Sequence, residues 1–487
     1  MRLKHFYKIV LLLIVTGFSV SCSENEVDPQ LSVSTKTVSF EYEGGTSEEI
    51  TIEANSTWSI SNSAASWLQL SKASGDNGAS ATTITVTSNE TGYSRSVVLT
   101  VEAANGQARR ITITQKGSLY PTYNVTPKAP DETGMTSTAM ELVAKMKMGI
   151  NLGNTLEAPT EGQWAGKVTE SYVKFLKQKG FNAVRIPATW ISNHASDPDK
   201  MKIDPVWLAR VKEVVGWCVA NDMYVVLNIH GDGILSKETI TKAKQEVTNA
   251  KQKALWEQIA TTMRDFDEHV IFAGANEPPA ENAEQMAILT DYYETFIKAV
   301  RSTGGKNSYR VLAVQGPDTD PTKTATLMNT MPTDKVPNKL IVEIHDYTPS
   351  LFTIMTDGDP TWGTMIYYWG KGNHSTIEPE RNATFGEEDA IDTEFQNIKQ
   401  KFVDKGIPVI LGEYAAWRRN AIHNANHLPM DLDKHNKSVN DWTYYVTKQA
   451  KANGIQPFHW EIGFMLDRDN DVVLDQPMLD ALIEGSK

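Results

Sequence analysis

Eight short apolar runs, separated by stretches with helical periodicity, fill the chain from about residue 138 onward. Such runs are typical of strands buried on both faces of a parallel sheet. Eight of them, alternating with helices over roughly 350 residues, predict an eight-stranded β/α (TIM) barrel. The expected strands are 147–152, 182–187, 224–229, 270–275, 310–315, 340–345, 408–413 and 456–461, and the expected helices are 170–179, 205–220, 251–266, 284–301, 394–405 and 439–452.

An open, doubly wound sheet is the alternative for this alternation. That fold places a Gly-rich phosphate-binding turn after its first strand, and the segment Gly149–Asn154 lacks the required glycine spacing. The barrel is therefore favoured. Two long segments, at about 231–250 and 346–390, leave the carboxyl ends of the third and sixth strands and are expected to wall a cleft there.

The chain before the barrel has a different composition. Residues 30–117 are rich in Thr, Ser, Val and Ile, in alternating runs divided by turn residues such as Asn105-Gly106. This pattern predicts an all-β, immunoglobulin-like sandwich, with Trp58 and Trp67 most simply placed in its core. Residues 118–138 contain three prolines and are interpreted as a linker, which leaves residues 139–487 for the barrel domain.

The amino terminus has the layout of a secretory signal. Basic residues precede the apolar stretch Ile9–Val15, which is too short to span a membrane. Residues 1–22 end in Phe18-Ser19-Val20-Ser21-Cys22, which resembles a bacterial lipobox, with Ser19 where leucine is commonest. The resemblance implies lipidation of Cys22. The alternative is ordinary cleavage near Ser21.

The acidic residues 23–28 resemble the surface-export signals of Bacteroidetes lipoproteins. The order Trp58, Trp67-Leu68, residues 74–78 and the closing Thr114-Gln115-Lys116-Gly117 resembles a BACON domain, a module common on Bacteroidetes surface proteins. These resemblances imply a lipid-anchored protein of the outer membrane, exposed at the cell surface, with the sandwich as a spacer.

Charge and cysteine content exclude other classes. The formal net charge of −13 argues against a nucleic-acid partner and, more weakly, against an anionic polymer. The two cysteines, Cys22 and Cys218, cannot form a disulfide framework, and Cys218 is expected to be a small buried side chain.

Residues of catalytic type stand at the carboxyl ends of the expected strands. Because a barrel brings these ends to one face, we expect a single site there. Two of the residues are carboxylates, Glu277 and Glu413, and a carboxylate pair is what glycosidic-bond cleavage requires. The full set is Arg185, His230, Asn276, Glu277, His345, Tyr347, Glu413 and Trp460.

At these residues the chain resembles glycoside hydrolase family 5, of clan A, over about residues 145–475. The resemblance implies that Glu277, in Asn-Glu-Pro, is the acid/base and that Glu413, in Leu-Gly-Glu-Tyr, is the nucleophile. It also implies that Arg185 bonds the nucleophile and that Asn276 holds the sugar 2-hydroxyl. His230 and His345 would line the site, Tyr347 would sit against the nucleophile, and Trp460 would floor the subsite before the scissile bond.

The segments Asn151–Glu157 and Leu466-Asp467-Arg468 resemble the subfamily 4 endoglucanases and xyloglucanases. We therefore expect Asn151, and also Trp190 just past the second strand, to contact substrate. Gly231 departs from the subfamily pattern, which has a second histidine after His230. A missing side chain there is expected to widen a subsite for branches.

The physical roles agree with these assignments. Hydrolysis with retention places the two carboxyls about 5–5.5 Å apart. Arg185 should depress the pKa of Glu413, whereas burial beside a negative charge should raise that of Glu277. Glu343 and Glu461, also near strand ends, are interpreted as structural ion-pair partners.

Aromatic side chains near the cleft would stack on pyranose rings. The candidates by position are Trp164, Trp190, Trp362, Trp369 and Trp417, each equally well placed in the core, whereas Trp207, Trp217, Trp256 and Trp442 fall in helices and should be packing residues.

Other chemistries fit less well. His230, Asp232, His345 and Asp346 lack the closely spaced pair of a metal site, so neither a metal nor a cofactor is expected. No Gly-x-Ser-x-Gly elbow is present, so a nucleophilic serine is not expected either.

The sequence therefore predicts a monomeric, retaining, endo-acting β-1,4-glycanase for a plant cell-wall glucan. The alternatives are a β-mannanase or glucomannanase, and a non-catalytic surface glycan-binding lipoprotein.

Overall fold

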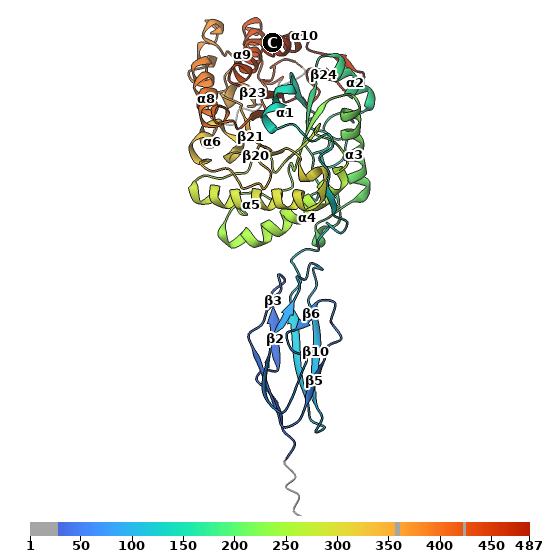
Figure 1. The fold of residues 1–487 in the computed structure, drawn as a ribbon. Helices are drawn as coiled ribbons and strands as arrows, with labels where there is room; N and C mark the ends of the chain where they lie inside the picture. The colour runs from blue at the N-terminus through green and yellow to red at the C-terminus, as the bar shows by residue number, and fades with distance from the viewer. Residues whose placement is uncertain (1–27, 356–360, 422–424) are drawn as a thin grey trace, which may run out of the picture. The chain divides into compact units, whose positions relative to one another are not determined.

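The computed structural model describes residues 28–355, 361–421 and 425–487. The expected signal segment and Cys22 lie outside this range. The described residues form two compact units: one has the residues up to Asn89 together with Ser94–Lys116, and the other has Glu90–Tyr93 and Gly117–Lys487 (Figure 1).

The described part of the first unit consists of strands and turns, in sheets of three, five and three strands. Its central hairpin pairs β10 (Arg95–Ala103) with β11 (Ala108–Gln115), which places Leu99 opposite Ile111. Both side chains are fully buried in an apolar core that also contains Trp58, so the expected all-β domain is confirmed. The other strands are β1 (Leu31–Val33), β2 (Thr37–Phe40), β3 (Gly45–Thr46), β4 (Ile50–Ala54), β5 (Trp58–Ser61), β6 (Leu68–Leu70), β7 (Ser74–Gly75), β8 (Gly78–Thr82) and β9 (Ile84–Val86).

Eight parallel strands of the second unit close into a barrel, as the apolar runs predict. Each strand pairs with its neighbours in chain order, and the last pairs with the first. The strands are β13 (Gly149–Asn151), β14 (Ala183–Ile186), β17 (Tyr224–Asn228), β18 (Val270–Ala273), β20 (Leu312–Gln315), β21 (Leu340–His345), β22 (Val409–Glu413) and β23 (Ile455–His459).

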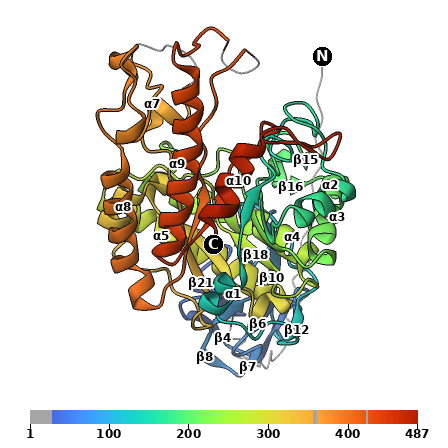
Figure 2. The ribbon, with the colours of Figure 1, turned by 90° about the horizontal axis from the view of Figure 1, so that it is seen from above.

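Helices surround these strands (Figure 2). The six expected helices are present as α2 (Glu170–Gln178), α3 (Pro205–Ala220), α4 (Gln245–Met263), α5 (Ala283–Ser302), α8 (Glu388–Lys401) and α9 (Leu432–Ala452). Four further helices were not expected: α1 (Ala139–Lys145), α6 (Pro321–Leu327), α7 (Ser350–Thr353) and α10 (Gln476–Gly485). The remaining small strands are β12 (Lys128–Pro130), β15 (Ala195–Asp197), β16 (Lys202–Ile203), β19 (Gly304–Gly305), β24 (Leu466–Asp467) and β25 (Val472–Val473).

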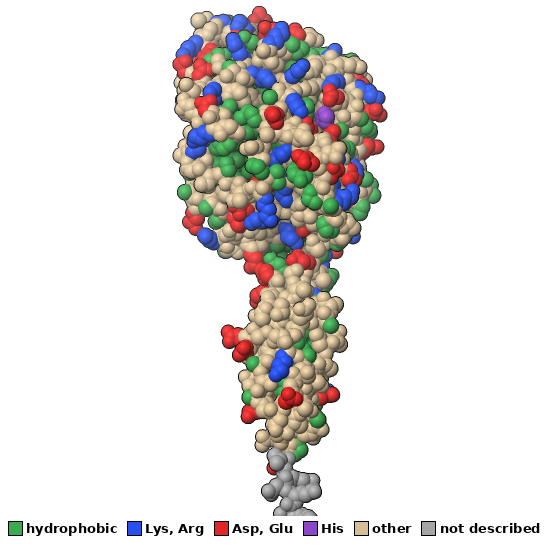
Figure 3. Space-filling model, viewed as in Figure 1, with side chains coloured by type: hydrophobic (Ala, Val, Ile, Leu, Met, Phe, Trp, Pro, Cys, Tyr) green, Lys and Arg blue, Asp and Glu red, His purple; other side chains and the backbone are tan. Residues whose placement is uncertain are grey.

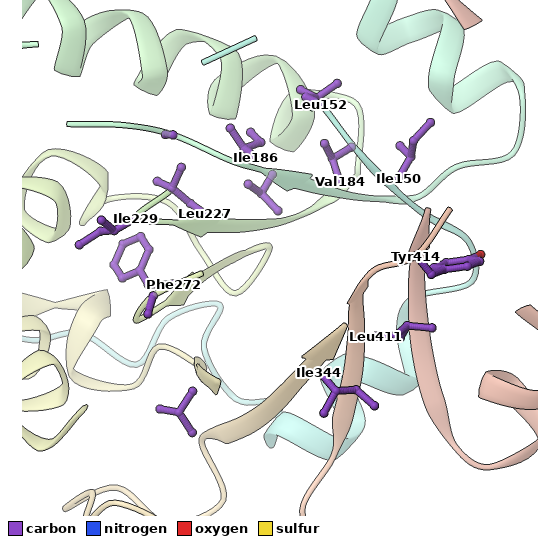
Figure 4. Close-up of a cluster of buried hydrophobic side chains, with 14 of the residues drawn as sticks. Ile150, Leu152, Val184, Ile186, Leu227, Ile229, Phe272, Ile344, Leu411 and Tyr414 are labelled. Atoms are coloured by element: carbon purple, nitrogen blue, oxygen red, sulfur yellow. The ribbon is translucent and has the colours of Figure 1, made fainter. Parts of the chain in front are cut away.

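Alternate residues of the barrel strands join two different cores. Ile150, Val184, Leu227 and Ile344 belong to the large cluster between strands and helices (Figure 4). Residues at the intervening strand positions, Ala183, Val226, Ile271 and Ile341 among them, join a second cluster with Leu142 and Val143 of α1. This period of two is that of a barrel whose interior is filled by side chains, and α1 contributes to the filling. Cys218 is fully buried in the first cluster, as expected.

The expected linker, residues 118–138, is instead held against the barrel and belongs to the barrel unit. The buried Glu257 of α4 accepts hydrogen bonds from the Thr122 hydroxyl at 2.8 Å and from the Tyr123 amide at 2.7 Å. Strand β12 pairs with β19, and Lys339 donates to the Met135 carbonyl. The prolines suggested a free segment, but long-range partners fix its backbone. We call residues 118–138 the strap.

The two long segments expected as cleft walls follow β17 and β21. The second contains α7 and runs to α8. On the face drawn in Figure 3, acidic and basic side chains of the barrel unit lie interspersed. Among the described residues, the helices are all too short or too polar to cross a membrane.

Candidate active site

The carboxyl ends of the barrel strands bring one set of polar side chains together. Arg185 comes from β14, His345 from β21 and Glu413 from β22, while Glu277 follows β18. Parallel strands in a closed barrel end at the same rim, so residues up to 228 positions apart in the chain become direct hydrogen-bond partners. The expected convergence at this rim is observed.

Glu413 is held as a buried carboxylate. Its side chain is 6% exposed. The Arg185 guanidinium donates to Oε1 at 2.7 Å, and the Tyr347 hydroxyl donates to Oε2 at 3.0 Å. Burial alone would raise the pKa of this carboxyl, but the positive charges of His345 and Arg185 outweigh it and lower the pKa to about 2. Glu413 is therefore ionised at neutral pH, the form that a nucleophile needs.

Arg185 is fully buried and organises the floor of the site. Besides Glu413, it donates to Glu343 at 2.7 Å, to the Asn151 side-chain oxygen at 3.0 Å and to the Asn276 side-chain oxygen at 2.8 Å. A planar guanidinium with four such partners has a single orientation. Arg185 thus fixes Glu413 and Asn276, the residue next to Glu277, together.

Asn151 was expected to contact substrate, and the structure places it elsewhere. It is fully buried, and its amide donates to the Gly412 carbonyl at 2.8 Å and to the Phe458 carbonyl at 3.1 Å. Because it lies beneath Arg185 and ties β13 to β22 and β23, it positions the arginine and has no surface for a sugar.

Glu343 completes this layer, as an ion-pair partner in agreement with its expected role. Its second oxygen accepts from the Gln315 amide at 2.5 Å, and Gln315 in turn accepts from the Ala275 backbone N–H at 2.9 Å. Gln315 was not identified from the sequence. Gln315 ends β20, the one barrel strand for which the sequence analysis names no candidate site residue. A polar residue at that position could have indicated a role in the site.

His345 joins the two glutamates. Its Nδ1 lies 2.8 Å from Glu277 Oε1 and 3.7 Å from Glu413 Oε2. Burial would lower the pKa of His345. The negative charge of Glu413, and the hydrogen bonds that His345 makes with Glu277 and Glu343, outweigh burial and raise this pKa to about 9. His345 is therefore an imidazolium at neutral pH, and its Nδ1–H donates to Glu277.

The two candidate catalytic glutamates are close. One carboxylate oxygen of each, together with a His345 ring nitrogen, lies within 4.8 Å of the others. This separation matches the narrow spacing of retaining glycosidases, about 5–5.5 Å, and not the inverting spacing of about 6.5–9.5 Å. The expected burial of Glu277 is not observed, because its side chain is 43% exposed at the rim. A sugar chain over the site would cover it.

His230 and Trp460 form one wall. Their rings stack with centroids 5.9 Å apart and planes inclined by 14°. Burial lowers the pKa of His230 to about 4, so this ring is neutral and has one donor and one acceptor nitrogen. Both residues are partly exposed, as are Asn276 and Tyr347, which is what a substrate-contacting residue needs.

Two of the expected stacking tryptophans are buried instead. Trp190 has no exposed surface, and its indole donates to the Asn228 carbonyl at 3.0 Å. Its backbone is held by Asp232, which accepts from the amides of Trp190, Ile191 and Ser192. Trp369 is also buried. Trp164 and Trp362 are exposed, and Trp417 is partly exposed.

Gly231 lines a pocket beside Glu277. A pocket of about 300 Å³ is lined by Gly231, Gly233, Asn276 and Glu277, among others. Gly231 has φ of +75°, and a Cβ there would meet Thr189 at 3.2 Å. The glycine thus permits a left-handed turn as well as leaving space.

Glu277, His345 and Glu413 are close enough together to be ligands of one metal ion. However, His345 carries a proton at neutral pH and is already hydrogen-bonded to Glu277, and the Arg185 guanidinium is hydrogen-bonded to Glu413. A metal ligand must be the neutral imidazole. The donor set therefore does not fit a metal.

Comparisons with known proteins agree with this geometry. The cellulase model of glycosyl hydrolase family 5 matches residues 146–465, and the BACON model matches residues 56–116. A xyloglucan-specific endo-β-1,4-glucanase from Bacteroides ovatus is 32% identical over 502 aligned residues, covering 98% of this chain and 96% of that protein. Endoglucanase A from Paenibacillus barcinonensis is 29% identical over 379 residues, covering 72% of this chain and 90% of that protein.

Two of the similar solved structures are xyloglucanases of family 5. A Bacteroides ovatus family 5 xyloglucanase in complex with a XXXG heptasaccharide has a TM-score of 0.68 at 30% identity, covering 94% of this chain and all of that chain. A family 5 xyloglucan-specific β-1,4-glucanase from a ruminal metagenomic library, in complex with XXLG, has a TM-score of 0.64 at 34% identity. The match covers 72% of this chain and 96% of that chain. The chain belongs to glycosyl hydrolase family 5, with a BACON domain preceding its catalytic barrel.

Proposed function

We propose that this protein is a retaining endo-β-1,4-glucanase that cleaves xyloglucan, using Glu413 as nucleophile and Glu277 as acid/base. One observation carries the mechanism: the two carboxylates lie within 4.8 Å of each other, and only Glu413 is buried and bonded to an arginine. The asymmetry supports these roles, because the nucleophile must be ionised and the acid/base must exchange protons with the leaving group and water.

In the first step, a Glu413 oxygen attacks the anomeric carbon and the bond to the glycosidic oxygen breaks. Glu277 gives its proton to that oxygen, so the leaving chain departs with a hydroxyl group. In the second step, Glu277 takes a proton from water, the water oxygen attacks the anomeric carbon, and the bond to Glu413 breaks. Two inversions give net retention.

The neighbours of the carboxylates support both steps. Arg185 and Tyr347 hold the Glu413 carboxylate in one orientation for attack, and its negative charge is neutralised when the bond to the anomeric carbon forms the glycosyl ester. The His345 imidazolium, 2.8 Å from Glu277, stabilises that carboxylate once it has lost its proton. The second alternative function, a glycan-binding protein without catalysis, would need neither this separation nor this charge arrangement.

The relatives support the substrate class. Several are named endoglucanases, and two of the similar structures are a family 5 xyloglucanase in complex with a XXXG heptasaccharide and a xyloglucan-specific β-1,4-glucanase in complex with XXLG. Long segments after β17 and β21 flank the carboxyl-end rim, an arrangement that suits binding along a polymer.

Reducing-end release from xyloglucan, barley β-glucan, carboxymethyl cellulose and glucomannan tests the proposal, with Glu413→Ala as the control. The expected result is release that is greatest on xyloglucan and is abolished by the substitution. Release from glucomannan alone would reassign the enzyme as a mannan-type glycanase. No release from any polymer would contradict the enzymatic proposal.

We also infer, from residues 1–28, that Cys22 is lipidated and that the mature protein is anchored at the outer membrane and exposed at the cell surface. We propose separately that the protein is a monomer. Cys22→Ser should move the protein from the membrane fraction to the soluble fraction and remove labelling by a clickable fatty acid. A membrane-bound, labelled Cys22→Ser variant would contradict the anchor. A dimer mass in light scattering of the soluble variant would contradict the monomer.

A further inference from the structure

A buried aspartate stands between two residues of the active site. Asp346 follows His345 and precedes Tyr347, and it is 1% exposed. Its backbone N–H donates to the Glu413 carbonyl at 3.0 Å, so the turn after β21 is fastened to the strand that carries Glu413. A shift of Asp346 would therefore reach both Tyr347 and Glu413.

The Asp346 carboxyl shapes the turn that presents Tyr347. Its Oδ1 accepts from the backbone N–H of Thr348 at 2.8 Å, which closes a turn around Tyr347. The Tyr347 carbonyl accepts from the Thr353 hydroxyl at 2.6 Å. This turn sets the direction of the Tyr347 side chain, whose hydroxyl donates to Glu413 Oε2 at 3.0 Å.

A second acidic side chain, Glu394 of α8, also lies beside Thr348. Hydrogen bonding from the Thr348 side chain lowers the pKa of both the Asp346 and the Glu394 carboxyl, so the two groups share this neighbour. Asp320, just before α6, carries a negative charge that raises the pKa of both. In the described part of the chain, neither Asp346 nor Glu394 forms an ion pair with a basic residue. The charges that act on the pair are therefore acidic.

One oxygen of each carboxyl lacks a hydrogen-bond donor. Asp346 Oδ2 and Glu394 Oε2 are shielded from solvent and have no partner among the described residues. A charged oxygen buried without a donor costs desolvation free energy, and buried polar atoms are usually paired. Among the described residues, the cluster at the rim is the only one close enough for a metal, so a shared cation does not satisfy these oxygens.

A proton can take the place of the missing partner. Burial is the largest cause that raises both pKa values, to about 6 for Asp346 and to about 8 for Glu394, and the charge of Asp346 adds to the second. At neutral pH the pair therefore carries one proton, which is held by Glu394.

We propose that Asp346 and Glu394 are a positioning pair that holds one proton, and that this proton keeps the turn at Tyr347 in place for catalysis. The inference rests on the proposed glucanase function and deepens it. While Glu394 is neutral, the pair has a single negative charge, and Asp346 Oδ1 accepts from Thr348. When Glu394 also ionises, two negative charges repel each other beside Thr348. The turn then loosens, and Glu413 loses its hydrogen bond from Tyr347.

The first test separates the acceptor oxygen of Asp346 from the rest of the side chain. Asp346→Asn keeps an oxygen for the Thr348 N–H, whereas Asp346→Ala removes it. On a dinitrophenyl cellobioside, kcat/KM reports attack by Glu413 and needs no proton from Glu277. At about pH 6 we expect Asp346→Ala to lower this kcat/KM by about tenfold or more and Asp346→Asn to retain most of it. In a Tyr347→Phe background, Asp346→Ala should cost little more, because it acts through Tyr347.

The second test follows the proton. In the unsubstituted enzyme, kcat/KM on the same substrate should fall on the alkaline side with a midpoint near the pKa of Glu394, about 8. Because Glu394→Gln cannot ionise, its midpoint should move up toward about 9, where His345 loses its proton. Glu388→Gln is the matched control, since Glu388 lies on the same helix and also has a buried oxygen without a partner. It should keep the midpoint near that of the unsubstituted enzyme.

Three results would overturn the inference. The first is an equal loss in Asp346→Asn and Asp346→Ala, because the acceptor oxygen would then be irrelevant. The second is an alkaline midpoint that Glu394→Gln leaves unchanged. The third is a loss in Asp346→Ala that adds in full to that of Tyr347→Phe. Failure of the unsubstituted enzyme on both the dinitrophenyl cellobioside and xyloglucan would instead contradict the proposed glucanase function.

Discussion

The sandwich and the rim of the barrel use their buried interiors in opposite ways. The sandwich core is apolar, with residues such as Leu99, Ile111 and Ile113 fully buried. The rim buries Arg185 and Glu343 just as completely. Buried charges cost desolvation free energy that their pairing repays only in part, whereas buried apolar area stabilises directly. The sandwich interior therefore contributes to stability, whereas the buried charges of the barrel rim contribute to catalysis and lower the stability.

The difference is visible in how buried polar groups are used. In the sandwich, the Gln115 amide donates to the backbone carbonyls of Glu41, Tyr42 and Thr87, which closes the end of a strand. At the rim, Arg185 connects four side chains from four different strands or their ends. Substitutions should therefore affect folding in the first region and catalysis in the second.

The largest effect is expected at Glu413. Glu413→Gln removes the nucleophile but keeps a hydrogen-bond acceptor for Arg185, so the fold should persist. We expect kcat on polymer to fall by about 10⁴-fold or more. Circular dichroism and the melting temperature should show a folded protein. An active Glu413→Gln variant would contradict the view that the buried charges at the rim serve catalysis whereas the sandwich core serves stability.

Glu277→Gln should have a smaller and substrate-dependent effect. Loss of general acid catalysis is expected to lower kcat on polymer by about 10²–10⁴-fold. Because a dinitrophenyl leaving group departs without protonation, the first step on a dinitrophenyl cellobioside should be nearly as fast as in the unsubstituted enzyme. A burst of dinitrophenolate in stopped flow would report this. Equal losses on both substrates would contradict the acid/base role.

Leu99→Ala should show the reverse pattern. Removing a fully buried leucine from the sandwich core is expected to lower its free energy of unfolding by about 2–5 kcal/mol. The kcat on soluble polymer should stay unchanged, because the catalytic groups all lie in the other unit. Denaturant unfolding and initial rates on the same sample measure both quantities. A matching fall in kcat would show that the sandwich supports catalysis.

Two truncations sharpen the boundary between the regions. A chain beginning at Ser118 keeps the strap, whereas one beginning at Ala139 leaves the buried Glu257 without its bonds to Thr122 and Tyr123. We expect the second chain to be less stable than the first by about 3 kcal/mol or more. Equal melting temperatures of the two truncated chains would show that residues 118–138 do not stabilise the barrel and act only as a linker.

The smallest effect is expected from pH acting on His345. Its folded pKa, about 9, is raised above the ordinary 6.5, so the stability it contributes is complete below about pH 6.5 and is lost as the pH rises through about 9. Glu413, with its pKa lowered to about 2, loses its contribution only as the pH falls below about 4.5 toward 2. The difference in unfolding free energy between the unsubstituted protein and His345→Asn should therefore narrow from about pH 6 to about pH 10. A constant difference would contradict the imidazolium.

Much of this arrangement could be predicted from the sequence. The barrel strands were recognisable because they are apolar throughout, and the carboxyl-end rule then brought Arg185, Glu277 and Glu413 together. Helix α1 escaped notice because it has only seven residues, although Thr138 and Glu141 form a capping box.

Other features depend on partners that are distant in the chain. The strap was interpreted as a linker because Glu257, which holds it, lies more than 130 residues away. Trp190 was expected to face substrate, but Asp232 folds its backbone inward. Local composition contains no information about either contact.

The catalytic role of Glu413 is tested most directly by trapping the glycosyl-enzyme with a 2-deoxy-2-fluoro cellobioside that carries a good leaving group. We expect a mass increase of one fluorinated disaccharide, located by peptide mapping at Glu413, together with loss of activity. Labelling at Glu277, or inactivation without a covalent adduct at Glu413, would contradict it.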